Sequence, residues 1–310
     1  MPRLRGFDPE TDRRSVLKAG AEFVENWLVP ALTDRYLRTP PHDPSDPLAD
    51  ISIPLTRFSQ FGSAVLGLGD IDEPSIDIKA LAAIFDLEGF TAFAEEADAH
   101  LIVPDFLHDF LSWLFETIRE LSKARQEGDR IYLYCPLPVW AKFTGDGVLL
   151  LWSIDDAEIS AFCRQNKRDR KTQIQGDIGN IILVLYNVCR RYWEDFYLRI
   201  PKSSDKVPKR LRCGAAQGSV YSVGSGLDYV GSCINMAARL QKLGRLSRYL
   251  SLCILQKGID IEHNPVERLQ NLLIRKKTVV RSATGRRIVY VVKEEFDTLN
   301  KKDQALLKDP

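Results

Sequence analysis

The sequence predicts an α+β fold, in which helices pack on an antiparallel sheet. Two observations predict it. Short apolar runs of strand length recur between residues 80 and 292. They are interspersed with longer segments whose apolar residues recur at helical spacing. Strands and helices mixed in this order are typical of an α+β domain with a ferredoxin-like core.

The chain divides by pattern into three parts. Residues 10–38 carry a helical pattern, and the stretch Thr39-Pro40-Pro41-His42-Asp43-Pro44 cannot continue a helix. We therefore predict an N-terminal helix and Pro-rich linker over residues 1–50. The main domain is expected over residues 51–298, and residues 299–310 are predicted to form a C-terminal tail.

Within the main domain, each element is expected from its own pattern. The apolar run at 80–85 reads as a buried strand that ends at Asp86, and Pro104 with Asp105 is expected to open a long helix. The charged segments 167–171 and 201–209 are predicted to be surface loops. The remaining elements are strands at 130–134 and 148–152, a helix at 177–192, a strand pair at 211–223 bent at Gly218, a helix at 231–243, and strands near 279 and at 288–292.

Composition excludes several functional classes. Lys and Arg total 43 against 42 Asp and Glu, which leaves a formal charge of +1. This balance argues against a nucleic-acid coater or an anionic-membrane binder. The apolar runs are too short to span a bilayer, and the N-terminus leads into no apolar signal segment. Six scattered cysteines without a C-x-x-C pair favour reduced thiols in a cytoplasmic protein.

Two acidic motifs suit a metal-bound phosphate. In Asp86-Leu87-Glu88-Gly89-Phe90-Thr91 an acid ends a strand, and Gly turns the chain into a helix whose N–H groups can bind phosphate. In Lys142-Phe143-Thr144-Gly145-Asp146-Gly147 a second acid lies in a hairpin before another buried strand. Each motif alone is more often a turn. Together they supply the two carboxylates that a two-metal phosphoryl-transfer site requires.

A third motif lies on the predicted helix at 231–243. Asn235 and Arg239 are four residues apart and project from one face. A solvated polar face explains most such pairs. An Arg aimed at a triphosphate would instead stabilise charge on the transferred phosphorus.

In this order and spacing the motifs, together with Arg212-Cys213-Gly214-Ala215-Ala216-Gln217-Gly218, resemble the class III adenylyl and guanylyl cyclases over residues 80–245. The resemblance implies the family's fold, a ferredoxin-like cyclase domain. It also implies two Mn²⁺ or Mg²⁺ ions per site, held by Asp86, Asp146 and the Leu87 carbonyl. The further implied roles are phosphate binding by Gly89, Phe90, Thr91 and Arg212, ribose orientation by Asn235, and transition-state stabilisation by Arg239.

The resemblance also implies a head-to-tail homodimer. In this family the acidic residues that bind the metals come from one protomer, and the helix that carries the Asn and the Arg of the same site comes from the other. The reaction implied is attack of the substrate's 3′-OH on its own α-phosphorus, with release of pyrophosphate. One departure from the family concerns the γ-phosphate. Ser282 stands at about the position where ordinary members carry a Lys.

Lys142 and Asp228 align with the positions that read the base in this family. Lys142 offers a hydrogen-bond donor and Asp228 an acceptor, and each of the four bases can form hydrogen bonds with such a pair. A looser resemblance, to the bacterial pyrimidine cyclases of anti-phage defence, favours UTP or CTP as substrate. It implies antiviral signalling through cyclic UMP or cyclic CMP, which activates a separately encoded effector. The alternatives are an adenylyl cyclase, or an inactive cyclase-homology module that only binds nucleotide.

Overall fold

The computed structural model describes residues 37–38, 51–52, 68–96, 99–155, 157–200, 206–224, 226–281 and 283–310. The chain forms two compact units. The first comprises Met1–Ile76 and Tyr221–Val230, and the second comprises Asp77–Val220 and Gly231–Pro310. The expected domain bounds at residues 50 and 298 stay predictions.

In the first unit, two short antiparallel pairs are described. β1 (Leu37–Arg38) pairs with β2 (Ile51–Ser52), so the end of the predicted N-terminal helix is a strand instead. The rest of that helix and the Pro-rich stretch lie outside the described residues. β9 (Asp228–Val230) pairs with Tyr221–Val223.

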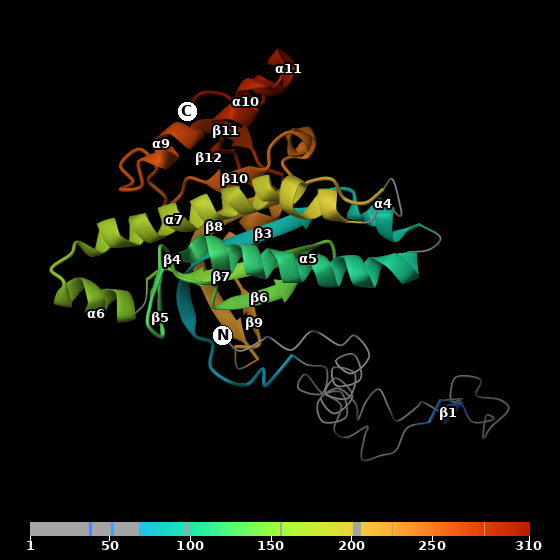
Figure 1. Ribbon diagram of the computed structural model, residues 1–310, viewed down its shortest axis with the longest axis horizontal. Coiled ribbons are helices and arrows are strands. Elements are labelled where there is room, and N and C mark those ends of the chain that lie inside the picture. The colour runs from blue at the N-terminus through green and yellow to red at the C-terminus, as the bar shows by residue number, and fades with distance from the viewer. Residues whose placement is uncertain are drawn as a thin grey trace. The chain divides into compact units, whose positions relative to one another are not determined.

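The second unit is built on a sheet with the strand order β11-β12-β10-β8-β3-β7-β6 (Figure 1). Its neighbouring strands are antiparallel except β8 and β10, which are parallel, so the sheet is mixed and not wholly antiparallel as predicted. The exception arises because a helix, α8, connects these two strands. The bounds are β3 (Asp77–Leu87), β6 (Trp140–Phe143), β7 (Gly147–Ser153), β8 (Leu211–Val223), β10 (Leu252–Leu255), β11 (Leu273–Val279) and β12 (Arg286–Val292).

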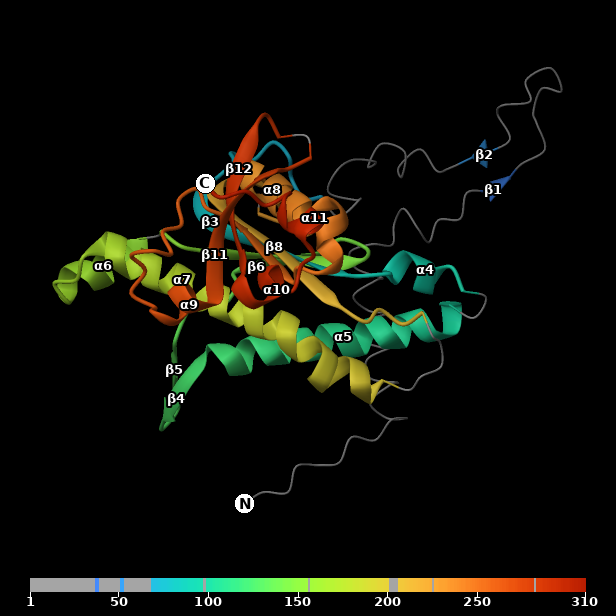
Figure 2. The same cartoon turned by 90° about the horizontal axis from the view of Figure 1, so that it is seen from above.

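Helices pack on both faces of this sheet, which confirms the α+β class. α5 (Ala99–Ser122) and α7 (Arg170–Arg191) run beside each other along one face (Figure 2). Alternate residues of β3 and β8 enter the large apolar cluster shared with α5 and α7. The intervening residues face α8 (Ser232–Leu240), which packs on β3 and β10. This alternation puts Asp86 and Arg212 on the α8 face.

Several elements differ from their predictions. Pro104 lies inside α5, which begins at Ala99, because apolar residues before the proline continue the helical pattern. α7 begins at Arg170, so part of the segment predicted as a charged loop is helical. β8 is one continuous strand through Gly218. The predicted strand at 130–134 is confirmed as β5 (Arg130–Leu133), but it pairs with β4 (Lys123–Glu127) in a separate sheet.

The C-terminal residues 299–310, for which the sequence predicts a tail, pack against other parts of the second unit. Leu307 is buried, Lys308 pairs with Lys277 through the backbone, and Asp309 forms an ion pair with Lys276 at 2.8 Å. The remaining elements are α4 (Phe90–Ala94), α6 (Ala157–Gln165), the π-helix η1 (Tyr192–Phe196), the 3-10 helices η2 (Tyr197–Arg199) and η3 (Gly244–Arg248), α9 (Arg268–Leu272), α10 (Lys293–Asp297) and α11 (Lys301–Gln304).

Two further findings bear on the sequence predictions. All six cysteines are buried and free, as expected for a chain without disulfides. Within the described ranges, no helix combines the length and apolar character needed to cross a membrane.

Candidate active site

The two predicted metal acids lie together at the end of β3. Asp86 is only 1% exposed, because α8 covers its face of the strand. Asp146 lies in the hairpin between β6 and β7, and its carbonyl accepts a hydrogen bond of 2.9 Å from the Leu87 N–H. Gly147 permits this close approach, since a Cβ there would lie 1.9 Å from the Phe85 carbonyl oxygen. The hairpin therefore presents its acid beside the strand end.

A single cation bridges the two carboxylates. The Lys242 Nζ lies 3.1 Å from Asp86 Oδ1 and 3.1 Å from Asp146 Oδ2. Partial burial lowers the pKa of Lys242, but Asp86 and Asp146 outweigh burial and hold that pKa above its usual value. Lys242 lies two residues after the end of α8 and three residues after Arg239. The turn that follows α8 therefore contacts Asp86 and Asp146 of its own chain.

Arg212 binds the same buried carboxylate from the neighbouring strand. Its Nε donates to Asp86 Oδ2 at 3.0 Å, its Nη2 contacts the same oxygen, and its Nη1 lies 4.0 Å from Glu88. The Gln241 amide nitrogen, in the orientation that satisfies both groups, lies 3.2 Å from each Asp86 oxygen. Arg212 thus pairs with Asp86, the predicted metal ligand, whereas the resemblance implied that Arg212 binds phosphate.

The predicted phosphate-binding turn follows Asp86 directly. Gly89 adopts a φ of 88°, which favours glycine, and forms the N-cap of α4. The first N–H groups of a helix, here those of Phe90 and Thr91, have no partner within the helix. The turn is held in place because the Glu88 N–H donates to the Arg210 carbonyl at 3.0 Å.

Asn235 and Arg239 lie on α8, as predicted. Asn235 is exposed, and Arg239 is partly buried. Asn235 lies in the first half of α8, whereas Lys242 lies two residues beyond its last residue, Leu240. Asn235 and the lysine that contacts the acids therefore belong to different ends of this segment.

The two predicted base-reading residues belong to different units. Lys142 is exposed on β6 and pairs with Leu149, and Leu149 pairs with Ile84. This register puts Lys142 on the same face of the sheet as Asp86. Asp228 belongs to the first unit, where it accepts a hydrogen bond from the Tyr229 N–H. Their joint role stays a prediction, as does the γ-phosphate contact near Ser282, which lies outside the described residues.

Sequence reasoning missed Lys242 and Gln241. Their positions gave one usable signal: Lys242 follows Arg239 by three residues and so shares its helix face. Only the packing of α8 on β3 shows that the residues at the end of this face lie next to Asp86.

The acid pair fits a divalent cation by its chemistry. Carboxylate and carbonyl oxygens are the ligands that Mg²⁺ and Mn²⁺ prefer, and Mg²⁺ commonly needs only one or two carboxylates beside substrate phosphates. The Lys242 ammonium stands in for such an ion, since it contacts both acids at once. Over the described residues, no cluster of three or more His, Cys, Asp or Glu offers a metal site made by side chains alone.

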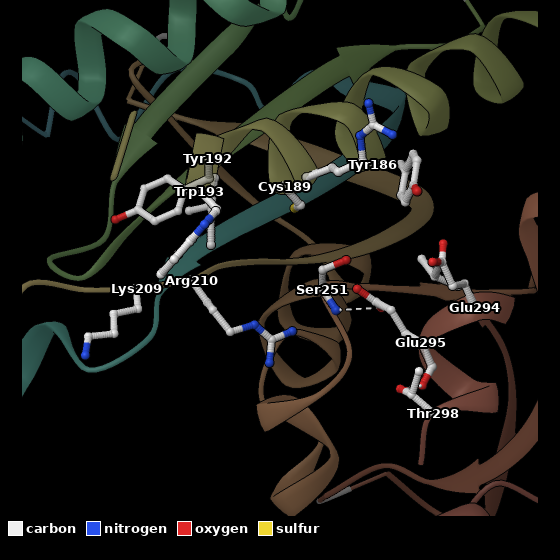
Figure 3. Close-up of a pocket in the computed structure, with 13 residues that line it drawn as sticks. Tyr186, Cys189, Tyr192, Trp193, Lys209, Arg210, Ser251, Glu294, Glu295 and Thr298 are labelled. Atoms are coloured by element: carbon white, nitrogen blue, oxygen red, sulfur yellow. Dashed lines mark hydrogen bonds between the residues drawn. The ribbon is translucent and has the colours of Figure 1, made fainter. Parts of the chain in front are cut away.

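A separate cavity of about 520 Å³ lies near Arg210 (Figure 3). Its wall includes Glu295, which accepts a hydrogen bond of 2.9 Å from the Ser251 N–H. Burial raises the pKa of Glu295, although the hydrogen bonds from Ser251 oppose the shift. None of the predicted site residues lines this cavity. It is therefore distinct from the acid pair.

No protein-family model and no curated protein matches the chain. Among solved structures, two described as a bacterial light-regulated adenylyl cyclase are similar, each with a TM-score of 0.44, at 14% and 16% identity. The matches cover 93% and 75% of this chain, which spans 64% and 57% of theirs. An adenylate/guanylate cyclase/hydrolase from Silicibacter pomeroyi matches 70% of this chain and 98% of its own, with 16% identity and a TM-score of 0.38.

Proposed function

We propose that the chain is a class III nucleotidyl cyclase that converts a nucleoside triphosphate to its 3′,5′-cyclic monophosphate and pyrophosphate. One observation carries the proposal. Asp86 and Asp146, from two separate motifs, come close enough for one cation to contact both. A buried carboxylate is costly unless it is paired. A second carboxylate directed at the same point therefore indicates a site built for cations.

Bound divalent ions would make the substrate's 3′-OH easier to deprotonate and would neutralise the triphosphate. The chain's own residues bind the phosphate groups of the substrate. The turn at Gly89 directs helix N–H groups toward the β- and γ-phosphates, and Arg239 stabilises charge on the α-phosphoryl group. The 3′-oxygen forms a bond to the α-phosphorus, the bond to the bridging oxygen breaks, pyrophosphate leaves, and the 3′-OH proton passes to solvent.

We propose a pyrimidine triphosphate, UTP or CTP, as the substrate, and cyclic UMP or cyclic CMP as a messenger in antiviral defence that activates a separate effector. Support comes from the looser sequence resemblance and from Tyr229, whose bulk helps to fill a pocket for one ring. The pair Lys142 and Asp228 is compatible with every base. ATP therefore remains the rival substrate.

The test is to incubate the purified full chain with Mn²⁺ and each nucleoside triphosphate separately, and to identify products by mass. We expect cyclic UMP or cyclic CMP together with pyrophosphate. Formation of cyclic AMP without turnover of UTP or CTP would show that ATP is the substrate, and the proposed type of reaction would be unchanged. Nucleotide binding without turnover of any nucleotide would favour the inactive module.

A further inference from the structure

The cavity near Arg210 is lined by charged side chains of both signs. Arg210 directly precedes β8 and Glu295 belongs to α10, and in Figure 3 the Ser251 side chain lies between them. The volume of about 520 Å³ falls within the range of small-molecule pockets. A ligand there would therefore meet a positive and a negative region. The charged side chains of the wall are Arg190, Lys209, Arg210, Glu294 and Glu295.

The acids of this wall lack a cationic partner. Glu295 is half-buried and accepts a hydrogen bond of 2.9 Å from the Ser251 N–H. Among the residues that the structure describes, neither Glu295 nor Glu294 forms an ion pair. Burial raises the pKa of Glu295, because desolvation disfavours its charge. The ammonium group of a ligand would supply the opposite charge that this carboxylate lacks.

The Arg210 side chain is held in place mainly by uncharged groups. Its Nη2 donates to the Tyr249 carbonyl at 3.0 Å, and its Nη1 contacts the Arg248 carbonyl. The acid with which it pairs, Glu88, lies 3.9 Å away. A guanidinium group has more N–H donors than these contacts occupy. Arg210 is therefore positioned rigidly and retains donors for a carboxylate.

Aromatic side chains complete the wall of this cavity. Trp193 is 45% exposed and Tyr186 is half-buried. The Trp193 ring stacks on Tyr197 with the ring centroids 4.5 Å apart, which limits its movement. Aromatic faces pack on apolar groups and attract cations. The cavity can therefore hold an apolar or aromatic group beside the charged ones.

We propose that this cavity binds a small zwitterion of the amino-acid class, whose carboxylate contacts Arg210, whose ammonium contacts Glu295 and whose side chain packs on Trp193. The cations of the wall repel a simple amine, and its acids repel a simple carboxylate. A zwitterion satisfies both sets. The proposal does not rest on nucleotide cyclisation, because none of the predicted metal-binding or catalytic residues lines the cavity.

The test compares three probes by isothermal titration calorimetry with the full-length protein. The probes are L-phenylalanine, 3-phenylpropionate, which lacks the ammonium group, and phenethylamine, which lacks the carboxylate. We expect phenylalanine to bind about tenfold more tightly than either analogue, because each analogue loses a hydrogen bond between charged groups. Equal affinity for phenylalanine and either analogue, or no binding of phenylalanine up to about 10 mM, overturns the proposal.

Variants of the full chain locate the two charged contacts. Glu295→Gln can still accept the Ser251 N–H but has no charge, so it should bind phenylalanine no better than 3-phenylpropionate. Arg210→Gln should bind phenylalanine no better than phenethylamine. The matched control is Glu267→Gln, an exposed acid at α9 outside the cavity, which should keep the tenfold preference of about the wild-type size. Circular dichroism checks that each variant is folded.

A preference for phenylalanine over 3-phenylpropionate that persists in folded Glu295→Gln shows that the ammonium group binds elsewhere, and it overturns the proposal. This outcome does not depend on Arg210→Gln being folded. If phenylalanine binds as expected but no nucleotide is cyclised, the zwitterion site stands and the proposed function fails.

Discussion

At the scale of single residues, Asp86 is the group in the site whose buried charge most needs partners. Its carboxylate is almost wholly buried and depends on Arg212, whose side chain is 11% exposed, on Lys242 and on Gln241. Arg212→Met should therefore destabilise the fold by about 3 kcal/mol, because it removes one partner of a buried ion pair. Urea unfolding measures the loss.

The control for this prediction is a double-mutant cycle. Asp86→Asn removes the charge that Arg212 neutralises, so Arg212→Met should cost less in that background, with a coupling of about 1 kcal/mol or more. Additive losses would show that the two side chains do not stabilise each other.

The positions of Asp86, Asp146 and Arg212 on the fold could be predicted from the sequence, because each lies in a local motif next to or within a readable strand. Their roles stay predictions, and the pairing of Arg212 with Asp86 was not predicted. Lys242 could not. Its importance depends on which face of the sheet α8 covers and where that helix ends. Periodicity predicts neither, because it defines an element's own apolar face and not its neighbour.

At the scale of elements, the position of α8 depends on Gly214. A Cβ at Gly214 would lie 2.1 Å from the Ala237 carbonyl oxygen and 2.5 Å from the Gln241 nitrogen. Gly214→Ala should therefore push α8 from β8 and destabilise the fold by about 2–3 kcal/mol, as overpacking does. Gly218→Ala is the matched control in the same strand, since the nearest atom there, the Cys233 Cβ, is 3.1 Å away. Urea unfolding of both variants tests the prediction, and equal losses would contradict it.

A pH-dependent contribution comes from Glu295 at α10. Its carboxyl has a raised pKa in the fold, so the folded chain binds that proton more tightly than the unfolded chain. Stability from this group is fully present at low pH and decreases as the pH rises from about 4.3, its unfolded pKa, through the raised pKa. Glu295→Gln cannot ionise but can still accept the Ser251 N–H. The variant should therefore gain stability relative to the wild type as the pH rises.

Urea midpoints at pH values of about 4 and about 7 measure that gain, since they lie on either side of the unfolded pKa. Glu294→Gln, the exposed neighbour, controls for the loss of one negative charge. A difference between wild type and Glu295→Gln that does not change with pH would contradict the assignment.

Among the elements, patterns identified β3 and β7, which are continuous apolar runs, and α5 and α7, which are long and periodic. The parallel strand β10 was missed. It has only four residues, and its partner β8 lies far back in the sequence. The bend predicted at Gly218 is absent, because β8 continues through this residue. A glycine can stay in a continuous strand where a neighbour approaches closely, as Cys233 does here.

At the scale of the whole molecule, the predicted homodimer follows from the resemblance and is compatible with the arrangement on α8. The exposed Asn235 lies in the first half of α8, whereas Lys242, which contacts the acids of its own chain, lies beyond the C-terminal end of that helix. Asn235 is therefore accessible to a partner chain. Each site would then combine the acids of one protomer with Asn235 and Arg239 of the other.

Mixing two inactive variants tests this division. Asp146→Asn removes a partly exposed acid and Arg239→Ala removes the α8 cation, so each homodimer should be inactive. In a mixed dimer one site has both defects and the other has none, so an equal mixture should recover about a quarter of wild-type turnover. Asp86→Asn mixed with Asp146→Asn is the matched control: both defects lie in the same half of the site, so no intact site can form. If native mass spectrometry shows subunit exchange but the first mixture stays inactive, each site is built from a single chain.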